Sequence, residues 1–154
     1  MTAQALSEMI LAEPDIEGVT YSGGEPFEQA EALNLLSRLL RKAGLSVMAY
    51  SGYAYADLCR RADPAVHELL GRLDLLVDGP FEAACAAPLL WRGSRNQQIY
   101  FLTDRYRSYA ADIDREGVDV EIRIAGRTIT VTGTVADNVL QDFTHNLHSA
   151  TVIA

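Results

Sequence analysis

The spacing of apolar and polar positions predicts strands and helices in alternation. Residues 2–12 show helical spacing and end before Pro14, and a short strand, Gly18–Tyr21, follows. Residues 27–43 predict an amphipathic helix with acidic first turns and basic last turns, and the apolar run 45–50 predicts a buried strand. The helix has an apolar stripe of Phe27, Ala30, Leu33, Leu36 and Leu40, broadened by Leu35 and Leu39.

A strand, a helix and a strand within about 30 residues form a βαβ unit, so both strands should be parallel with a right-handed crossover. A second such unit follows along the chain. Residues 81–97 show no clear period. The further predicted elements are helices at 55–62 and 65–73, strands at 74–78 and 98–102, a short helix at 104–114, a hairpin of strands 118–124 and 128–133, and a closing helix at 136–148.

These elements predict an α/β fold with two parts. Residues 1–103 form the βα domain, and residues 104–154 form a C-terminal hairpin and helix packed on it. With 154 residues, 49% of them hydrophobic and 22% charged, the chain is long enough to bury a core.

Charge and segment composition exclude several kinds of partner. The net charge of −8, without a cluster of Lys and Arg, predicts no nucleic-acid interface. The N-terminus has no cationic and apolar leader, and no apolar run approaches the roughly 18 residues of a membrane span, so we expect a cytoplasmic protein without a membrane partner. Two separate cysteines, Cys59 and Cys85, predict neither a disulfide framework nor a metal motif.

Glycines and polar residues gather where three predicted strands end. A Gly-Gly turn between strand and helix presents N–H groups to an anion, and the neighbouring Glu25 presents a carboxylate to a cation, so this turn suits a zwitterion such as an amino acid. Each segment alone also fits an ordinary turn or backbone cap. Because the carboxyl ends of parallel strands meet at one edge, their coincidence favours a ligand site. The three segments are 22–26 (SGGEP), 50–53 (YSGY) and 78–80 (DGP).

Residues 18–29 (GVTYSGGEPFEQ) resemble the glycine-rich S-adenosylmethionine motif of radical SAM activating enzymes, above all the anaerobic ribonucleotide reductase activating proteins and their single-cluster relatives. The likeness keeps the family's order and spacing over residues 16–102. It continues through 50–53 (YSGY), 76–81 (LVDGPF) and 91–97 (WRGSRNQ), and less specifically through 129–133 (ITVTG).

The resemblance implies a partial parallel βα barrel of the radical SAM type and a glycyl-radical-enzyme activase. Such enzymes cleave S-adenosylmethionine reductively, and the 5′-deoxyadenosyl radical removes a hydrogen atom from a glycine of a partner enzyme. Glu25 would take the ammonium of the methionine moiety. The implied cofactor-binding residues are Ser22, Gly23, Gly24, Glu25, Pro26, Ser51 and Asp78, and Arg92, Asn96 and Gln97 would lie near the cofactor or the partner.

The chain departs from the family at the iron–sulfur cluster. Family members hold a [4Fe–4S] cluster with a CxxxCxxC loop upstream of the glycine motif, whereas both cysteines here lie downstream of it. We therefore expect no cluster ligands in this chain, no catalytic or metal residues to assign, and no activity from it alone.

Two explanations stay open for this departure. The first is a truncated copy that has lost the family's first strand, which would leave the Gly18–Tyr21 strand with an unpaired edge and favour self-association. The second is a cluster-free, non-catalytic interaction or regulatory module. A generic phosphate binder is disfavoured, because the lysine of a P-loop and the third glycine of a dinucleotide fingerprint are missing.

Overall fold

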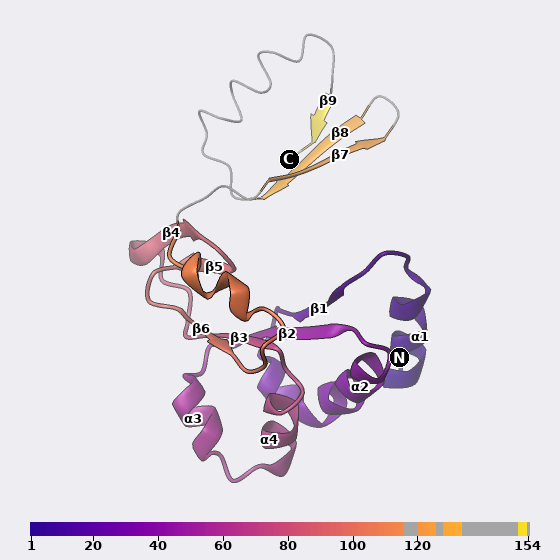
Figure 1. The fold of residues 1–154 in the computed structure, drawn as a ribbon, viewed down its shortest axis with the longest axis vertical. Coiled ribbons are helices and arrows are strands. Elements are labelled where there is room, and N and C mark those ends of the chain that lie inside the picture. The colour runs from indigo at the N-terminus through magenta and orange to yellow at the C-terminus, as the bar shows by residue number, and fades with distance from the viewer. Residues whose placement is uncertain (116–119, 126–127, 134–150, 154) are drawn as a thin grey trace.

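The computed structural model describes residues 1–115, 120–125, 128–133 and 151–153. At its centre is a four-stranded sheet in the order β1-β2-β3-β6 (Figure 1). The first three strands are parallel, as predicted, whereas β6 pairs antiparallel with β3. The α/β class is therefore confirmed, while the direction of β6 departs from a purely parallel arrangement. The strands are β1 (Gly18–Tyr21), β2 (Ser46–Tyr50), β3 (Leu75–Asp78) and β6 (Gln98–Phe101).

The α-helices of the described residues lie together on one side of this sheet (Figure 1). They are α1 (Ala3–Ala12), α2 (Ala30–Lys42), α3 (Tyr55–Arg60) and α4 (Pro64–Leu70). Thr2 caps α1, since its hydroxyl accepts a hydrogen bond from the N–H of Ala5 at 3.1 Å. Because α3 ends at Arg60 and α4 at Leu70, the helices predicted at 55–62 and 65–73 were too long at their carboxyl ends.

The predicted helix over 27–43 is wrong in its first turn. Residues Pro26–Gln29 form a separate 3₁₀ turn, η1, before α2 begins. The N–H of Glu28 donates to the carbonyl of Glu25 at 3.1 Å, an i to i+3 bond that defines the tighter turn. The Glu25 side chain caps the same turn, so the predicted ligand-binding segment 22–26 leads directly into the start of the helix.

The opposite side of the sheet carries a small hairpin, β4 (Ala86–Leu89) and β5 (Arg92–Ser94), reached through the 3₁₀ turn η2 (Ala83–Cys85) (Figure 1). The sequence predicted no element here, because both strands are very short and their register shifts between the two pairs of partners. The predicted helix at 104–114 is only a 3₁₀ segment, η3 (Arg107–Ala111).

A further sheet lies in the C-terminal part of the chain. Strands β7 (Val120–Ala125) and β8 (Thr128–Gly133) pair antiparallel, which confirms the predicted hairpin. A third strand, β9 (Thr151–Ile153), pairs parallel with β8 and was not predicted. The helix predicted at 136–148 lies outside the described residues.

The larger core lies between the helices and the sheet, and it includes most of the predicted stripe of α2. Leu35 is an exception: it is 44% exposed, so the prediction that it broadens the stripe is wrong. Ser37 faces the core in its place, donating to the carbonyl of Leu33 at 2.7 Å and lying 2.8 Å from the Tyr21 hydroxyl. The buried members are Phe27, Ala30, Leu36, Leu40, Val47, Ala49, Leu58, Val66, Leu69, Leu70, Leu73 and Leu76.

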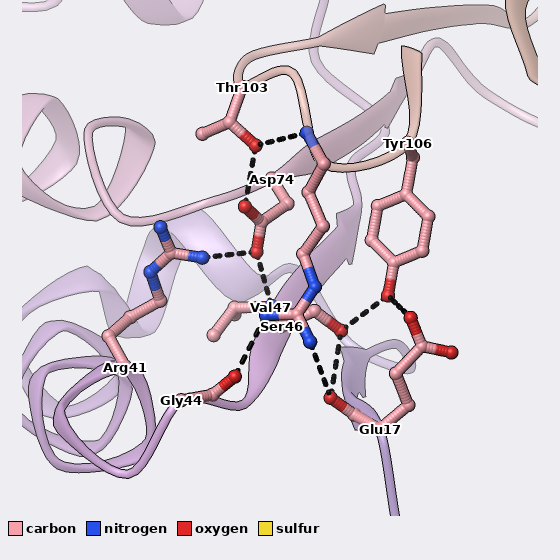
Figure 2. A network of polar contacts seen from close by, with 9 residues as sticks. Glu17, Arg41, Gly44, Ser46, Val47, Asp74, Thr103 and Tyr106 are labelled. Carbon is pink, nitrogen blue, oxygen red and sulfur yellow. Dashed lines mark hydrogen bonds and ion pairs between the residues drawn. The ribbon is translucent and has the colours of Figure 1, made fainter. Parts of the chain in front are cut away.

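A buried carboxylate, Asp74, ties the amino ends of the strands together (Figure 2). It is 1% exposed and accepts hydrogen bonds from the N–H of Val47 at 3.0 Å and the Thr103 hydroxyl at 2.6 Å, and it pairs with Arg41 of α2. Burial by itself disfavours the charged form, but the hydrogen bonds from Thr103, Val47 and Arg41 outweigh it and lower the pKa of Asp74.

The network of Figure 2 extends to β1 through Tyr106, whose hydroxyl lies 2.7 Å from both Glu17 Oε1 and Ser46 Oγ. Gly18 stands opposite Ser46 in the strand pair, and a Cβ at Gly18 would lie 1.8 Å from Ser46 Oγ. Only glycine permits this approach, so the glycine that begins β1 is required by packing.

We expect Asp74→Ala to lower the free energy of unfolding by about 3 kcal/mol, because it leaves the buried partners of the carboxylate unpaired. The exposed pair of Asp104 with Arg107 provides the control, and Asp104→Ala should cost about 0.5 kcal/mol or less. Urea unfolding at pH 7 measures both. Equal losses in the two variants would contradict the role of Asp74.

The difference in stability between wild type and Asp74→Ala should depend on pH. The pKa of Asp74 is lower in the folded protein than in the unfolded chain, where it is about 3.9. The contribution of Asp74 to stability is therefore complete above the unfolded-state pKa and is lost as the pH falls through the folded-state pKa. The stability difference between wild type and Asp74→Ala should therefore shrink in acid. A difference that widens as the pH falls would show that the sign is wrong.

Candidate functional site

Three loops meet at the carboxyl edge of the parallel strands, and together they line a cavity of about 150 Å³. Each loop follows one strand of the sheet. Gln97, which precedes β6, completes the wall. The structure thus brings together the segments that the sequence placed on one edge. The loop residues are Gly23 and Gly24 after β1, Ser51 and Gly52 after β2, and Gly79 and Pro80 after β3.

The loop after β1 depends on its two glycines. Gly23 has φ +77° and Gly24 has φ +58°, a conformation that side chains with a Cβ rarely adopt. Ser22 is exposed beside them, and Pro26 is buried as the first residue of η1. Gly23 and Gly24 therefore face the cavity, whereas Pro26 shapes the start of the helix.

The Glu25 carboxylate joins the first two loops. Its Oε1 accepts hydrogen bonds from the N–H of Phe27 at 3.1 Å and the Ser51 hydroxyl at 3.0 Å, and its Oε2 accepts one from the N–H of Gly52 at 2.9 Å. A carboxylate offers about four acceptor positions, so these bonds fix its orientation and leave room for one further donor. That arrangement suits the ammonium group of a ligand.

Asp78 has a structural role in this edge of the sheet. It is buried, and its Oδ2 accepts a hydrogen bond at 2.6 Å from the N–H of Tyr55, the first residue of α3. Ala54 precedes that helix and provides no side-chain cap, so Asp78 caps α3 from the neighbouring strand. Its contacts correspond to the capping interpretation left open by the sequence, and it does not line the cavity.

The β4–β5 hairpin is fastened to the loop after β3 by two amide side chains. Gln97 donates through Nε2 to the carbonyl of Gly79 at 3.2 Å and accepts at Oε1 from the N–H of Gly93 at 3.1 Å. Asn96 donates through Nδ2 to the carbonyl of Pro80 at 2.8 Å. These bonds hold the third loop in place, and only Gln97 among the three predicted residues of this segment lines the cavity.

Arg92 braces the hairpin from the other end. Its side chain is 7% exposed and donates to the carbonyls of Gln97 at 3.0 Å and Ile113 at 2.7 Å, and it pairs with Asp114. Arg92 Nε and Asn96 Oδ1 are buried without a hydrogen-bond partner among the described residues.

The sequence analysis assigned no role to five residues that line the cavity, namely Tyr50, Gly52, Gly79, Pro80 and Phe81. Gly52 supplies an N–H to Glu25, and Phe81, an exposed aromatic residue, lines the wall beside Pro80. Both directly follow a residue or segment that the sequence had singled out. Position next to Ser51 and to the Asp-Gly-Pro turn was therefore the available signal.

The described residues provide no group of three or more His, Cys, Asp or Glu that could hold a metal ion. Cys59 is exposed on α3 and Cys85 is half-buried in η2. Iron–sulfur clusters are held by cysteine thiolates, and two separate cysteines do not fit a three-thiolate loop. No helix in this described part is long and apolar enough to cross a membrane.

We expect Asp78→Ala to lower the free energy of unfolding by about 1 kcal/mol, the usual cost of losing a helix cap. Asp57→Ala is the control, because the exposed Asp57 of α3 pairs with Arg60 in its own helix. Chemical denaturation followed by circular dichroism measures the two changes. An Asp78→Ala protein as stable as wild type would exclude the capping role.

Comparison with protein families links this site to iron–sulfur proteins. A family model described as a 4Fe-4S single cluster domain matches residues 1–100 of the chain. The match includes all three loops of the cavity and the Gln97 wall.

Curated relatives share one name, anaerobic ribonucleoside-triphosphate reductase-activating protein. The protein of Pasteurella multocida (strain Pm70) is 34% identical over 108 residues, which is 67% of this chain and 67% of its own length. That of Enterobacteria phage T4 is 31% identical over 98 residues, 61% of this chain and 59% of its own length. That of Escherichia coli (strain K12) is 30% identical over 91 residues, 56% of either chain. The chain thus matches little more than half of the last two relatives.

Proposed function

This chain belongs to the family of anaerobic ribonucleoside-triphosphate reductase-activating proteins and 4Fe-4S single cluster domains, and from that membership we propose that it is the S-adenosylmethionine-binding part of such an activating protein. The proposed partner is a glycyl radical enzyme, anaerobic ribonucleotide reductase. The proposed site comprises Ser22, Gly23, Gly24, Glu25, Pro26 and Ser51, with Asp78 supporting it from the neighbouring strand.

The observation that carries this proposal is the hydrogen bonding of the Glu25 carboxylate. Three donors of the chain hold it in one orientation, two of them on Ser51 and Gly52, which line the cavity, and one acceptor position remains. The N–H groups of the adjoining glycine turn provide the complementary partner for a carboxylate. An amino-acid zwitterion, as in the methionine end of S-adenosylmethionine, carries an ammonium and a carboxylate and can therefore use both partners.

The size of the cavity supports the same assignment. Pockets that enclose a drug-sized ligand have volumes of about 300–1,000 Å³, whereas this cavity has about 150 Å³. It therefore suits the amino-acid end of the ligand, with the nucleoside end outside it. In the family the bound cofactor supplies the adenosyl group that removes a hydrogen atom from the partner's glycine, and this chain's residues bind and orient it.

The iron–sulfur cluster of the family does not fit the residues of this chain, which has only two cysteines in its sequence. We propose that the chain alone does not perform the radical reaction. Its share of the function is cofactor binding and docking of the partner. In the same way, we assign residues 1–103 to a partial barrel of the radical SAM type and residues 104–154 to an extension packed on it.

Glu25→Ala should weaken binding of S-adenosylmethionine at least tenfold in isothermal titration calorimetry, because a charged hydrogen bond contributes about 1.5–3 kcal/mol. The control is Glu31→Ala, which removes an exposed carboxylate from the first turn of α2. That variant should bind as wild type does. Identical titrations for Glu25→Ala and wild type would remove Glu25 from the site.

The position of β1 at the end of the described sheet predicts self-association through its edge. Light scattering over a range of protein concentrations should show a mass that rises above that of one chain. Thr20 is exposed in β1, so Thr20→Lys should restore the monomer by placing a charge on the edge. A wild-type protein that stays monomeric at every concentration would rule out this association.

A further inference from the structure

We infer that Glu28, Tyr53 and Arg61 form a clamp that positions the hydrogen-bond donors of Glu25. None of the three lines the cavity, so they would act on the ligand through Glu25 and its donors Ser51 and Gly52. This inference rests on the proposed function, because its consequence is the affinity for S-adenosylmethionine. Its structural part concerns the protein alone and can be tested without a ligand.

The three side chains contact one another directly. The Tyr53 hydroxyl donates to Glu28 Oε1 at 2.8 Å, and Arg61 Nη1 donates to the same oxygen at 3.0 Å. The guanidinium carbon of Arg61 lies 4.0 Å from the centre of the Tyr53 ring. A cation over an aromatic ring and a shared acceptor together define one geometry for the group.

The clamp bridges the two loops that Glu25 also joins. Glu28 belongs to η1, which Glu25 caps, and Tyr53 directly follows Gly52 in the loop after β2. The ladder between β1 and β2 ends at the pair Tyr21 and Ala49, so strand pairing does not extend to these loops. Side-chain contacts must therefore hold the two loops at a fixed distance.

Tyr53 couples the clamp to the site. Its N–H donates to Ser51 Oγ at 3.1 Å, and Ser51 Oγ in turn donates to Glu25. A displacement of Tyr53 therefore moves both donors from this loop, the Ser51 hydroxyl and the Gly52 N–H. Without them the Glu25 carboxylate would lose its fixed orientation toward the cavity.

Electrostatics keep the clamp closed at neutral pH. The hydrogen bond from Tyr53, followed by that from Arg61, lowers the pKa of Glu28, and the contacts of Arg61 with Tyr53 and then with Glu28 raise the pKa of Arg61. The ion pair is largely exposed, so it contributes little to global stability. Its effect should therefore appear in the position of the loop more than in the melting temperature.

The test compares two neighbouring arginines. Arg61→Ala opens the clamp, whereas Arg60→Ala removes only an exposed pair with Asp57 inside α3. Hydrogen–deuterium exchange followed by NMR, without ligand, should show faster exchange of the Gly52 amide in Arg61→Ala. The rate should stay at the wild-type value in Arg60→Ala. Tyr53→Phe, which keeps the ring under Arg61 but removes the hydroxyl, should give an intermediate rate.

Calorimetry with S-adenosylmethionine then measures the consequence for binding. We expect Arg61→Ala to weaken binding about fivefold, a coupling of ordinary size for residues in one network. In the Glu25→Ala background the same substitution should have a smaller effect, because the clamp positions the donors that hold Glu25. Arg61→Lys, which restores the charge but not the planar stacking, should recover part of the affinity.

The outcomes separate the two proposals. If wild type does not bind S-adenosylmethionine while Gly52 exchanges faster in Arg61→Ala, the proposed function fails and the clamp stands. If Gly52 exchange is the same in Arg61→Ala and wild type, the clamp is overturned whatever the ligand does. Additive losses of affinity in the double variant would also overturn it, because they would mean that Arg61 acts independently of Glu25.

Discussion

The buried carboxylate of Asp74 is the interaction that aligns the sheet (Figure 2). A charge removed from water costs several kcal/mol unless it is paired and hydrogen-bonded, so Asp74 is tolerated only when its partners are in place. Those partners come from α2, from β2 and from the segment after β6. Because they align the amino ends of the strands, they also decide which loops meet at the carboxyl ends. The cavity at the carboxyl edge therefore depends on contacts made at the opposite edge of the sheet.

The carboxylates of Asp74 and Glu25 lie at opposite edges of one sheet and differ in their hydrogen-bond partners. Asp74 is enclosed, and a guanidinium, a hydroxyl and a backbone N–H neutralise or bind it. Glu25 is half-buried, and its hydrogen-bond donors among the described residues are neutral, so they do not cancel its charge. The first carboxylate is complete within the protein, whereas the second keeps both a charge and an acceptor position for a ligand. This contrast, more than the glycine turn alone, makes the cavity a candidate for an ammonium group.

Much of this arrangement could be predicted from the sequence, because it follows from periodicity and from strand ends. The strand Gly18–Tyr21 is found with its predicted bounds, and the three loops converge because parallel strands end at the same edge. The β4–β5 hairpin could not be predicted, since its strands are too short for alternation to show. The sequence left a capping role open for Asp78, but neither its partner Tyr55 nor the contact of Tyr53 with Glu28 could be predicted, because both contacts join residues more than twenty positions apart. Such contacts are properties of tertiary packing and leave no local pattern.

The central claim is that the carboxyl edge of the sheet binds the amino-acid end of S-adenosylmethionine. Its most direct test is an NMR titration of the labelled chain with this compound, following backbone amides. We predict saturable chemical-shift changes at the amides of Gly23, Gly24 and Gly52. We expect none at Gly44, which lies beside Asp74 at the opposite edge. Shifts absent from all three cavity glycines at saturating ligand, or confined to residues around Gly44, would contradict it.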